Sequence, residues 1–104
     1  MSTSKISVIG GGSFGTVIAN ISADNGYEVS FWMRNKSQAE QLNRTRVNSQ
    51  YLPGYLLNER IVATSDMAAA VKDSGLIFVA VPSSSFRQVV RDMVPHISDD
   101  AVLI

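Results

Sequence analysis

Apolar residues in this chain occur in two alternating patterns, short continuous runs and runs with helical spacing. Residues 5–10 (KISVIG) form an apolar, β-branched run that ends at glycine, which predicts a buried strand. In residues 13–24 the apolar side chains recur at spacings of three and four, as on one face of a helix. Asn25 and Gly26 suit the left-handed turn that follows a helix, and residues 28–33 (EVSFWM) predict a second strand. The start of the chain therefore predicts a βαβ unit.

The alternation continues through the rest of the chain. A second helix is predicted to begin at Ser37, because Ser37 and Glu40 have the spacing of a capping box. Residues 48–60 contain the turn signal Pro53-Gly54 and predict a loop. The remaining predicted elements are a strand over residues 60–63, a short helix capped by Ser65 or Asp66 and ended by Gly75, a strand over residues 76–81, a helix over residues 84–94 and a strand over residues 101–104.

The order of these elements predicts an α/β fold. Strands that alternate with helices pair into a parallel sheet with helices on both faces. The run LIFVAV at residues 76–81 is apolar at every position, as expected for a strand that is covered on both faces. We therefore expect a doubly wound parallel sheet of the Rossmann type, in the strand order 3-2-1-4-5. A length of 104 residues fits one such domain.

Composition narrows the classes of function. Nine basic residues balance nine acidic ones, which argues against a nucleic-acid binder or a polybasic membrane anchor. The chain has no cysteine and hence no disulfide or thiolate metal site. His96 is expected to lie at the end of the last helix, where it suits the helix dipole, and Asp99 and Asp100 are expected to form a solvated turn, all three without a catalytic or metal-binding role. No apolar run reaches the roughly 18 residues of a membrane span, and the start MSTSKISVIG lacks the features of a secretory signal, so we expect a soluble, cytoplasmic protein.

Four glycines lie close together directly after the first predicted strand. Gly10, Gly12 and Gly15 match the pattern GxGxxG between a strand and a helix, the setting in which it binds dinucleotides. There, Gly10 allows a tight turn, Gly12 lets the backbone approach a pyrophosphate, and Gly15 lets the helix pack closely on the strand. An ordinary glycine-rich turn is the alternative. Gly11, the extra glycine, receives no role from the pattern.

The residues after the second predicted strand bear on which dinucleotide binds. NAD is usually held there by an acidic residue about 20 positions beyond the glycines. Here the segment FWMRNK places Arg34 and Lys36 at that point. A charge-assisted hydrogen bond from Arg34 to a 2′-phosphate, worth about 1.5 to 3 kcal/mol, would favour NADP over NAD. A solvated basic loop is the alternative.

Several other residues allow two interpretations. Ser83, Ser84 and Ser85 follow the fourth strand at the carboxyl edge of the sheet, where ligands bind, but at least one of them is expected to cap the next helix. Phe86 is either a core residue or a ring against the cofactor. Tyr51 is either a loop anchor or a contact near the adenosine.

The motifs GSFGT, YLPG and VAVPS occur in this chain in that order, and the combination is more specific than the glycine pattern alone. The longer segments around them are KISVIGGGSFGTVIAN, NGYEVSFWMRN, NSQYLPG, ATSDMAAAVKDSGLIFVAVPS and FRQVVRDMVPHI. Together these segments, which cover essentially the whole chain, resemble the N-terminal part of bacterial NAD(P)-dependent glycerol-3-phosphate dehydrogenase.

The resemblance implies a set of cofactor contacts. Arg34 occupies the family's 2′-phosphate position, which agrees with the argument from spacing. The positions that border the nicotinamide end are Val81, Pro82 and Phe86. The other implied contacts, in the glycine loop and the YLPG loop, are Ser13, Phe14 and Tyr51.

The resemblance also implies an activity for the whole enzyme, the transfer of a hydride between NAD(P)H and dihydroxyacetone phosphate or sn-glycerol 3-phosphate, which feeds glycerophospholipid synthesis. In this family the strand that begins AVLI continues into a Thr-Lys-Gly segment, and a helical domain brings another lysine and the groups that bind glycerol phosphate. We therefore expect residues 1–104 to be the dinucleotide-binding domain, without catalytic residues and without dehydrogenase activity of its own. The resemblance implies that the sheet is truncated after the fifth strand, so we expect that the free edge of this strand allows a homodimer that is an artefact of the truncation.

Two alternatives stay open at this point. One is another Rossmann reductase, such as a ketopantoate reductase or a relative of 6-phosphogluconate dehydrogenase, which shares the glycine motif but is not expected to carry the YLPG loop. The other is an NAD(P)-sensing module without chemistry, in which ligand occupancy changes association with a partner.

Overall fold

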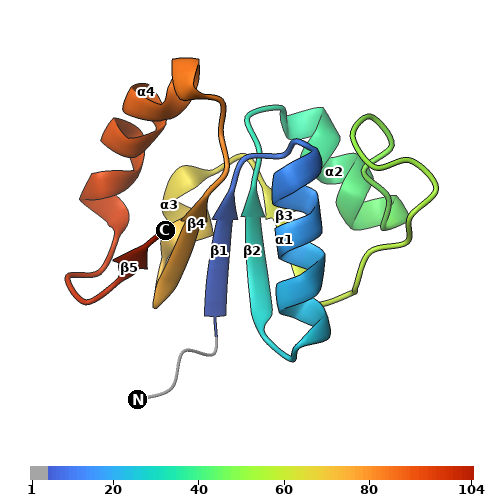
Figure 1. The fold of residues 1–104 in the computed structure, drawn as a ribbon, viewed down its shortest axis with the longest axis horizontal. Coiled ribbons are helices and arrows are strands. Elements are labelled where there is room, and N and C mark those ends of the chain that lie inside the picture. Colours follow the sequence, from blue (N-terminus) through green and yellow to red (C-terminus); the bar gives the residue numbers. More distant parts are fainter. Residues whose placement is uncertain (1–4) are drawn as a thin grey trace.

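A computed structural model describes residues 5–104 and contains one five-stranded parallel sheet (Figure 1). The strand order is β3-β2-β1-β4-β5, and each neighbouring pair runs parallel. The strands are β1 (Lys5–Ile9), β2 (Glu28–Trp32), β3 (Ile61–Thr64), β4 (Leu76–Val79) and β5 (Val102–Leu103). The predicted fold class and strand order are confirmed.

Helices connect the strands and cover both faces of the sheet. They are α1 (Ser13–Asp24), α2 (Lys36–Thr45), α3 (Met67–Val71), α4 (Ser83–Met93) and the short 3-10 helix η1 (Val94–His96). Within residues 5–104, none of the helices has the length and apolar character needed to cross a membrane. The cytoplasmic location stays a prediction.

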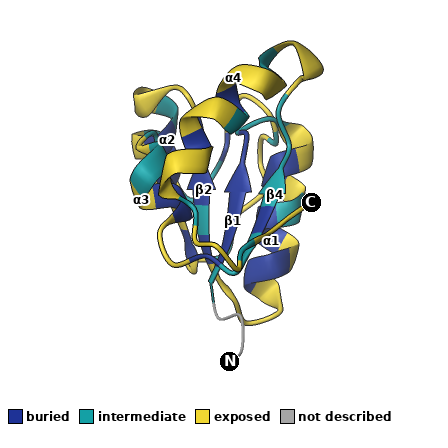
Figure 2. Cartoon of the chain, turned by 90° about the vertical axis from the view of Figure 1, so that its left-hand side faces the viewer, coloured by how far each residue is buried: buried dark blue, intermediate teal, exposed yellow. Residues whose placement is uncertain are grey.

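Two apolar clusters fill the space between sheet and helices, one on each face, because side chains of a strand alternate between faces. Val8 and Phe31 belong to the cluster under α1 and α2. The neighbouring residues Ile9 and Trp32 belong to the cluster under α3 and α4. Buried residues accordingly concentrate in the central strands and on the inward sides of the helices (Figure 2).

Two predicted helix boundaries were wrong. Helix α2 begins at Lys36, because Asn35 caps it by accepting a hydrogen bond at Oδ1 from the Gln38 backbone N–H (3.0 Å), so Ser37 is not the cap. Helix α3 begins after the predicted cap Asp66 but ends at Val71, well before Gly75. The left-handed residue that follows it is Asp73 (φ +59°), because aspartate tolerates this conformation better than most residues.

Strand β4 is less covered than its apolar sequence predicts. Ile77 is fully buried, whereas Leu76, Phe78 and Val79 are half-buried. On the α1 side, Leu76 and Phe78 border a groove near the amino ends of the strands. Strand β4 lies next to the short edge strand β5, which pairs with only two of its residues. Its apolar sequence therefore accompanies partial burial and not complete cover.

Candidate functional site

Three of the four clustered glycines form the loop between β1 and α1, the fourth, Gly15, lies in the first turn of α1, and two of the four have close backbone neighbours. Gly10 has φ +124°, and a Cβ atom there would lie 2.3 Å from the carbonyl oxygen of Ala80. A Cβ atom on Gly15 would lie 2.0 Å from the carbonyl oxygen of Gly10. These contacts confirm the tight turn at Gly10 and the close packing of helix on strand at Gly15.

Gly11, which has no role in the GxGxxG pattern, also has close neighbours. A Cβ atom there would lie 2.7 Å from Cβ of Met33, at the end of β2. Its carbonyl oxygen accepts hydrogen bonds from the side-chain amides of Gln38 (3.1 Å) and Asn48 (2.9 Å). These partners are distant in the sequence, so no local signal could have revealed them.

Gly12 differs from its neighbours, because a Cβ atom there would meet no atom of residues 5–104 within 4 Å. Gly12 is the N-cap of α1, and among the described residues no side chain accepts a capping hydrogen bond at this end of the helix. The free N–H groups of the first helical turn and the positive end of the helix dipole therefore face open space beside the glycine loop. That arrangement suits an anion such as a phosphate.

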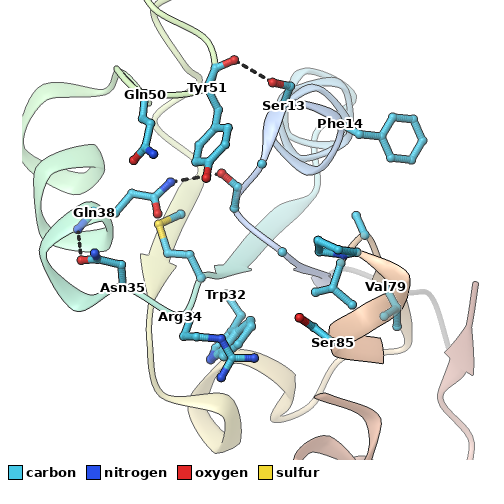
Figure 3. A pocket seen from close by; sticks show the side chains of 17 residues that line it. Ser13, Phe14, Trp32, Arg34, Asn35, Gln38, Gln50, Tyr51, Val79 and Ser85 are labelled. Atoms are coloured by element: carbon cyan, nitrogen blue, oxygen red, sulfur yellow. Dashed lines mark hydrogen bonds between the residues drawn. The ribbon is translucent and has the colours of Figure 1, made fainter. Parts of the chain in front are cut away.

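A cavity of about 760 Å³ lies over the carboxyl ends of β1, β2 and β4, next to this helix terminus (Figure 3). It brings together seven of the nine predicted site residues. They are Gly10, Gly12, Ser13, Phe14, Arg34, Tyr51 and Pro82. The other two, Gly15 and Phe86, lie outside the lining: Gly15 is buried beneath the loop, and Phe86 is half exposed on α4.

Tyr51 and Phe14 occupy opposite positions at the rim. The Ser13 hydroxyl donates a hydrogen bond to the Tyr51 carbonyl oxygen (2.9 Å), which ties residues 48–54 to the start of α1. The Tyr51 ring points into the cavity, whereas the Phe14 ring, 72% exposed, points away from Arg34 (Figure 3). Tyr51 thus anchors its loop and lines the cavity, and its contact with the adenosine stays a prediction.

Arg34 supplies positive charge to the cavity. It lies two residues after the end of β2, and its Cζ atom lies 5.6 Å from the centroid of the Trp32 ring, within the range of a cation–π contact. Trp32 is itself fixed, because it is buried and its indole N–H donates to the Ser65 carbonyl oxygen (3.1 Å). Among the described residues that line the cavity, none is acidic.

The serines after β4 do not cap α4, contrary to the sequence prediction. The N-cap of α4 is Pro82, and no side chain caps this helix. Instead, the Ser85 backbone N–H donates to the Pro82 carbonyl oxygen (2.9 Å), and Ser85 lines the cavity. The helix begins at Ser83, directly after Pro82, so all three serines lie inside its first turn and not at the capping position.

Several lining residues were missed by the sequence analysis. Met33 and Asn35 flank Arg34 at the carboxyl end of β2, so the rule that ligands bind at this edge could have found them. Gln38 and Gln50 reach the cavity from α2 and the following loop, which only the tertiary fold reveals. His96 is exposed, and residues 5–104 contain no group of three or more metal-ligating side chains placed to hold an ion.

Comparison with known proteins decides the family. The family model described as "NAD-dependent glycerol-3-phosphate dehydrogenase N-terminus" matches residues 5–104. The chain belongs to this family. A curated relative, glycerol-3-phosphate dehydrogenase (NAD(P)+) of Teredinibacter turnerae, is 47% identical over 100 residues, which are 96% of this chain and 29% of the relative. The chain therefore spans less than a third of the length of this relative.

Solved structures of the same family have the same fold. The glycerol-3-phosphate dehydrogenase of Coxiella burnetii superimposes with a TM-score of 0.91 at 30% identity, over 97% of this chain and 31% of that one. The enzyme of Plasmodium falciparum gives a TM-score of 0.87 at 28% identity, over 98% of this chain and 31% of that one. A ketopantoate reductase of Ralstonia eutropha, 20% identical with a TM-score of 0.78, shares the fold alone. The family match thus separates this chain from the alternative reductases.

Proposed function

We propose that this chain is the dinucleotide-binding part of an NAD(P)-dependent glycerol-3-phosphate dehydrogenase. One observation carries the proposal: an uncapped helix terminus and an open glycine face the same cavity as a basic side chain. A dinucleotide needs both features, since it has a pyrophosphate in its centre and an adenosine ribose, with or without a 2′-phosphate, on one side. The names of the relatives support the same cofactor class.

The pyrophosphate is proposed to lie on the loop at Gly12. The open space above this glycine lets the two phosphates approach the backbone, and the first turn of α1 offers N–H groups to their oxygens. Ser13, whose hydroxyl already bonds to the Tyr51 carbonyl, holds the loop beside this position. Binding here uses backbone groups, so it is shared by NAD and NADP.

The adenosine end is proposed to lie between Arg34 and Tyr51. Both side chains border the cavity from elements that the fold brings together, β2 and the loop after α2. Arg34 is positioned over Trp32 and faces no acidic lining residue among those described, so its charge is available for a 2′-phosphate. We therefore infer a preference for NADP over NAD.

The nicotinamide end is proposed to lie along residues 79–82, at the carboxyl end of β4. When bound, the nicotinamide supplies or accepts the hydride that is exchanged with dihydroxyacetone phosphate or sn-glycerol 3-phosphate. The residues of this chain bind and orient it, which is the main contribution of a protein to hydride transfer. Val81 and Pro82 present an apolar wall suited to a nicotinamide ring, and Phe86 stands just outside that wall.

The proposal is tested by calorimetric titration of the chain with NADPH and, separately, with NADH. We expect NADPH to bind more tightly, and Arg34→Ala to weaken NADPH by about tenfold to a hundredfold while leaving NADH nearly unchanged. Lys36→Ala is the matched control, since Lys36 is a nearby exposed cation outside the cavity lining. Equal loss for both cofactors, or an equal effect of Lys36→Ala, would contradict the role of Arg34.

We also infer that two copies of this chain associate through β5. This strand is at the edge of the sheet, and Val102, Leu103 and Ile104 are 55%, 40% and 63% exposed. An exposed apolar edge strand is a template for pairing with another chain. Light scattering over a range of concentrations checks this inference, and a monomer at every concentration would contradict it.

A further inference from the structure

Asn48 is a buried polar residue that the proposed cofactor contacts do not include. It lies after α2, is 1% exposed, and does not line the cavity. Buried polar side chains are costly unless their hydrogen bonds are satisfied. The hydrogen-bond partners of Asn48 therefore show which parts of the site this residue positions.

The side-chain amide of Asn48 uses its full hydrogen-bonding capacity as a donor. Its Nδ2 group donates to the Gly11 carbonyl oxygen (2.9 Å) and to the Thr16 hydroxyl (2.8 Å), and its Oδ1 atom accepts from Gln38 Nε2 (3.1 Å). Gln38 also donates to the Gly11 carbonyl (3.1 Å). One side chain thus joins the glycine loop, helix α1 and helix α2.

These bonds fix the orientation of the glycine loop. In a trans peptide the C=O and N–H groups point in opposite directions, so holding the Gly11 carbonyl also sets the direction of the Gly12 N–H. The Thr16 hydroxyl, held by Asn48, donates in turn to the Gly12 carbonyl (2.7 Å). Both peptide groups around Gly12, the glycine assigned to the pyrophosphate, are therefore anchored to Asn48.

The backbone of Asn48 holds the other wall of the cavity. Its carbonyl oxygen accepts hydrogen bonds from the N–H groups of Tyr51 (3.2 Å) and Leu52 (2.8 Å), which forms the turn that presents Tyr51. Tyr51 is bonded back to the glycine loop through Ser13. The glycine loop and the turn that presents Tyr51 are consequently both hydrogen-bonded to one buried residue, Asn48.

We propose that Asn48 is a positioning residue for the dinucleotide: it sets the glycine loop and the Tyr51 turn in their binding geometry before the cofactor arrives. This inference rests on the proposed function. Preorganised donors bind a ligand more tightly because less ordering is needed on binding. The network serves the part of the site common to both cofactors and has no bond to Arg34, so Asn48 affects affinity without affecting the choice between NADP and NAD.

The test compares Asn48→Ala and Asn48→Leu with the unmodified chain by titration with NADPH and NADH. Alanine is smaller than asparagine and leaves a cavity, whereas leucine has the same branched arrangement of heavy atoms and is larger, so a loss common to both variants reflects the missing hydrogen bonds and not a cavity. We expect each variant to weaken NADPH and NADH by similar factors, on the order of tenfold, so that the ratio of the two affinities is kept. Arg34→Ala, in contrast, changes that ratio.

Asn43→Ala is the matched control for a purely structural effect. Asn43 joins α2 to β3 through two hydrogen bonds with Ala63, at 2.8 Å each, and touches neither the glycine loop nor Tyr51. It should lower stability while leaving both affinities unchanged, when binding is measured well below the melting temperature of each variant.

Amide hydrogen exchange of the unliganded chain gives a readout independent of the cofactor. We expect faster exchange at residues 11–13 and 51–52 in the Asn48 variants and not in Asn43→Ala. Affinities unchanged in the Asn48 variants, or reduced equally by Asn43→Ala, would overturn the positioning role. An unmodified chain that binds neither nucleotide would overturn the proposed function and this inference together, whereas tight binding that the Asn48 variants retain would overturn only the inference.

Discussion

Individual glycines in the β1–α1 loop and at the start of α1 are required for different reasons, and the sequence pattern revealed only some of these reasons. The spacing of Gly10, Gly12 and Gly15 is a local pattern, so it could be interpreted without the structure. The need for glycine at position 11 arises from Met33, more than twenty positions further along, and was invisible to any local rule. The same holds for Asn48, whose partners lie in three separate segments.

The glycines allow a prediction that separates packing from binding. Gly15→Ala places a methyl group against the Gly10 carbonyl, where backbone must shift, and should cost about 1 to 3 kcal/mol of unfolding free energy. Gly12→Ala meets open space and should cost less than about 1 kcal/mol, yet weaken both nucleotides because the methyl group occupies the approach of the pyrophosphate. Urea denaturation and titration measure the two effects. Equal destabilisation by both substitutions would contradict the crowded space at Gly15 and the open space at Gly12.

At the level of helices and strands, the sequence predicted which segments are helices and which are strands, but it did not predict the residues at which they begin and end. Every predicted helix and strand exists, because each has apolar spacing of its own period. The ends depend on competition between nearby capping residues. Asn35 takes the N-cap of α2 two residues before Ser37, and Pro82 starts α4 without any serine cap.

The capping of α2 gives a second prediction. Asn35→Ala removes the acceptor for the Gln38 N–H and should lower the unfolding free energy by about 1 kcal/mol. Ser37→Ala, the residue that the capping-box pattern favoured, should have a much smaller effect, since Ser37 lies inside the helix. Thermal or urea denaturation of the two variants checks this, and a larger loss for Ser37→Ala would restore the original prediction.

The whole molecule follows from a few topological rules, which explains why its sheet order could be predicted from the sequence. Right-handed crossovers place β1 in the middle with helices on both faces, and the carboxyl ends of β1, β2 and β4 then meet at one edge. This arrangement brings Arg34 and Tyr51 to the glycine loop, as the cavity shows. The path of residues 46–60 could not be predicted, because it depends on tertiary contacts such as burial of Leu57 and the bond from its N–H to the Arg46 carbonyl (2.7 Å).

The most direct test of the account is a map of where a nucleotide binds on the molecule. Two-dimensional amide NMR of the labelled chain during titration with NADPH should show saturable shifts at residues 10–14, Arg34 and Tyr51, around the cavity at the carboxyl edge. Signals of Ile21, Tyr27 and Phe78, which border the groove near the amino ends of the strands, should stay in place. Shifts that gather at this groove, or no shifts at millimolar NADPH, would contradict a dinucleotide site on the glycine loop.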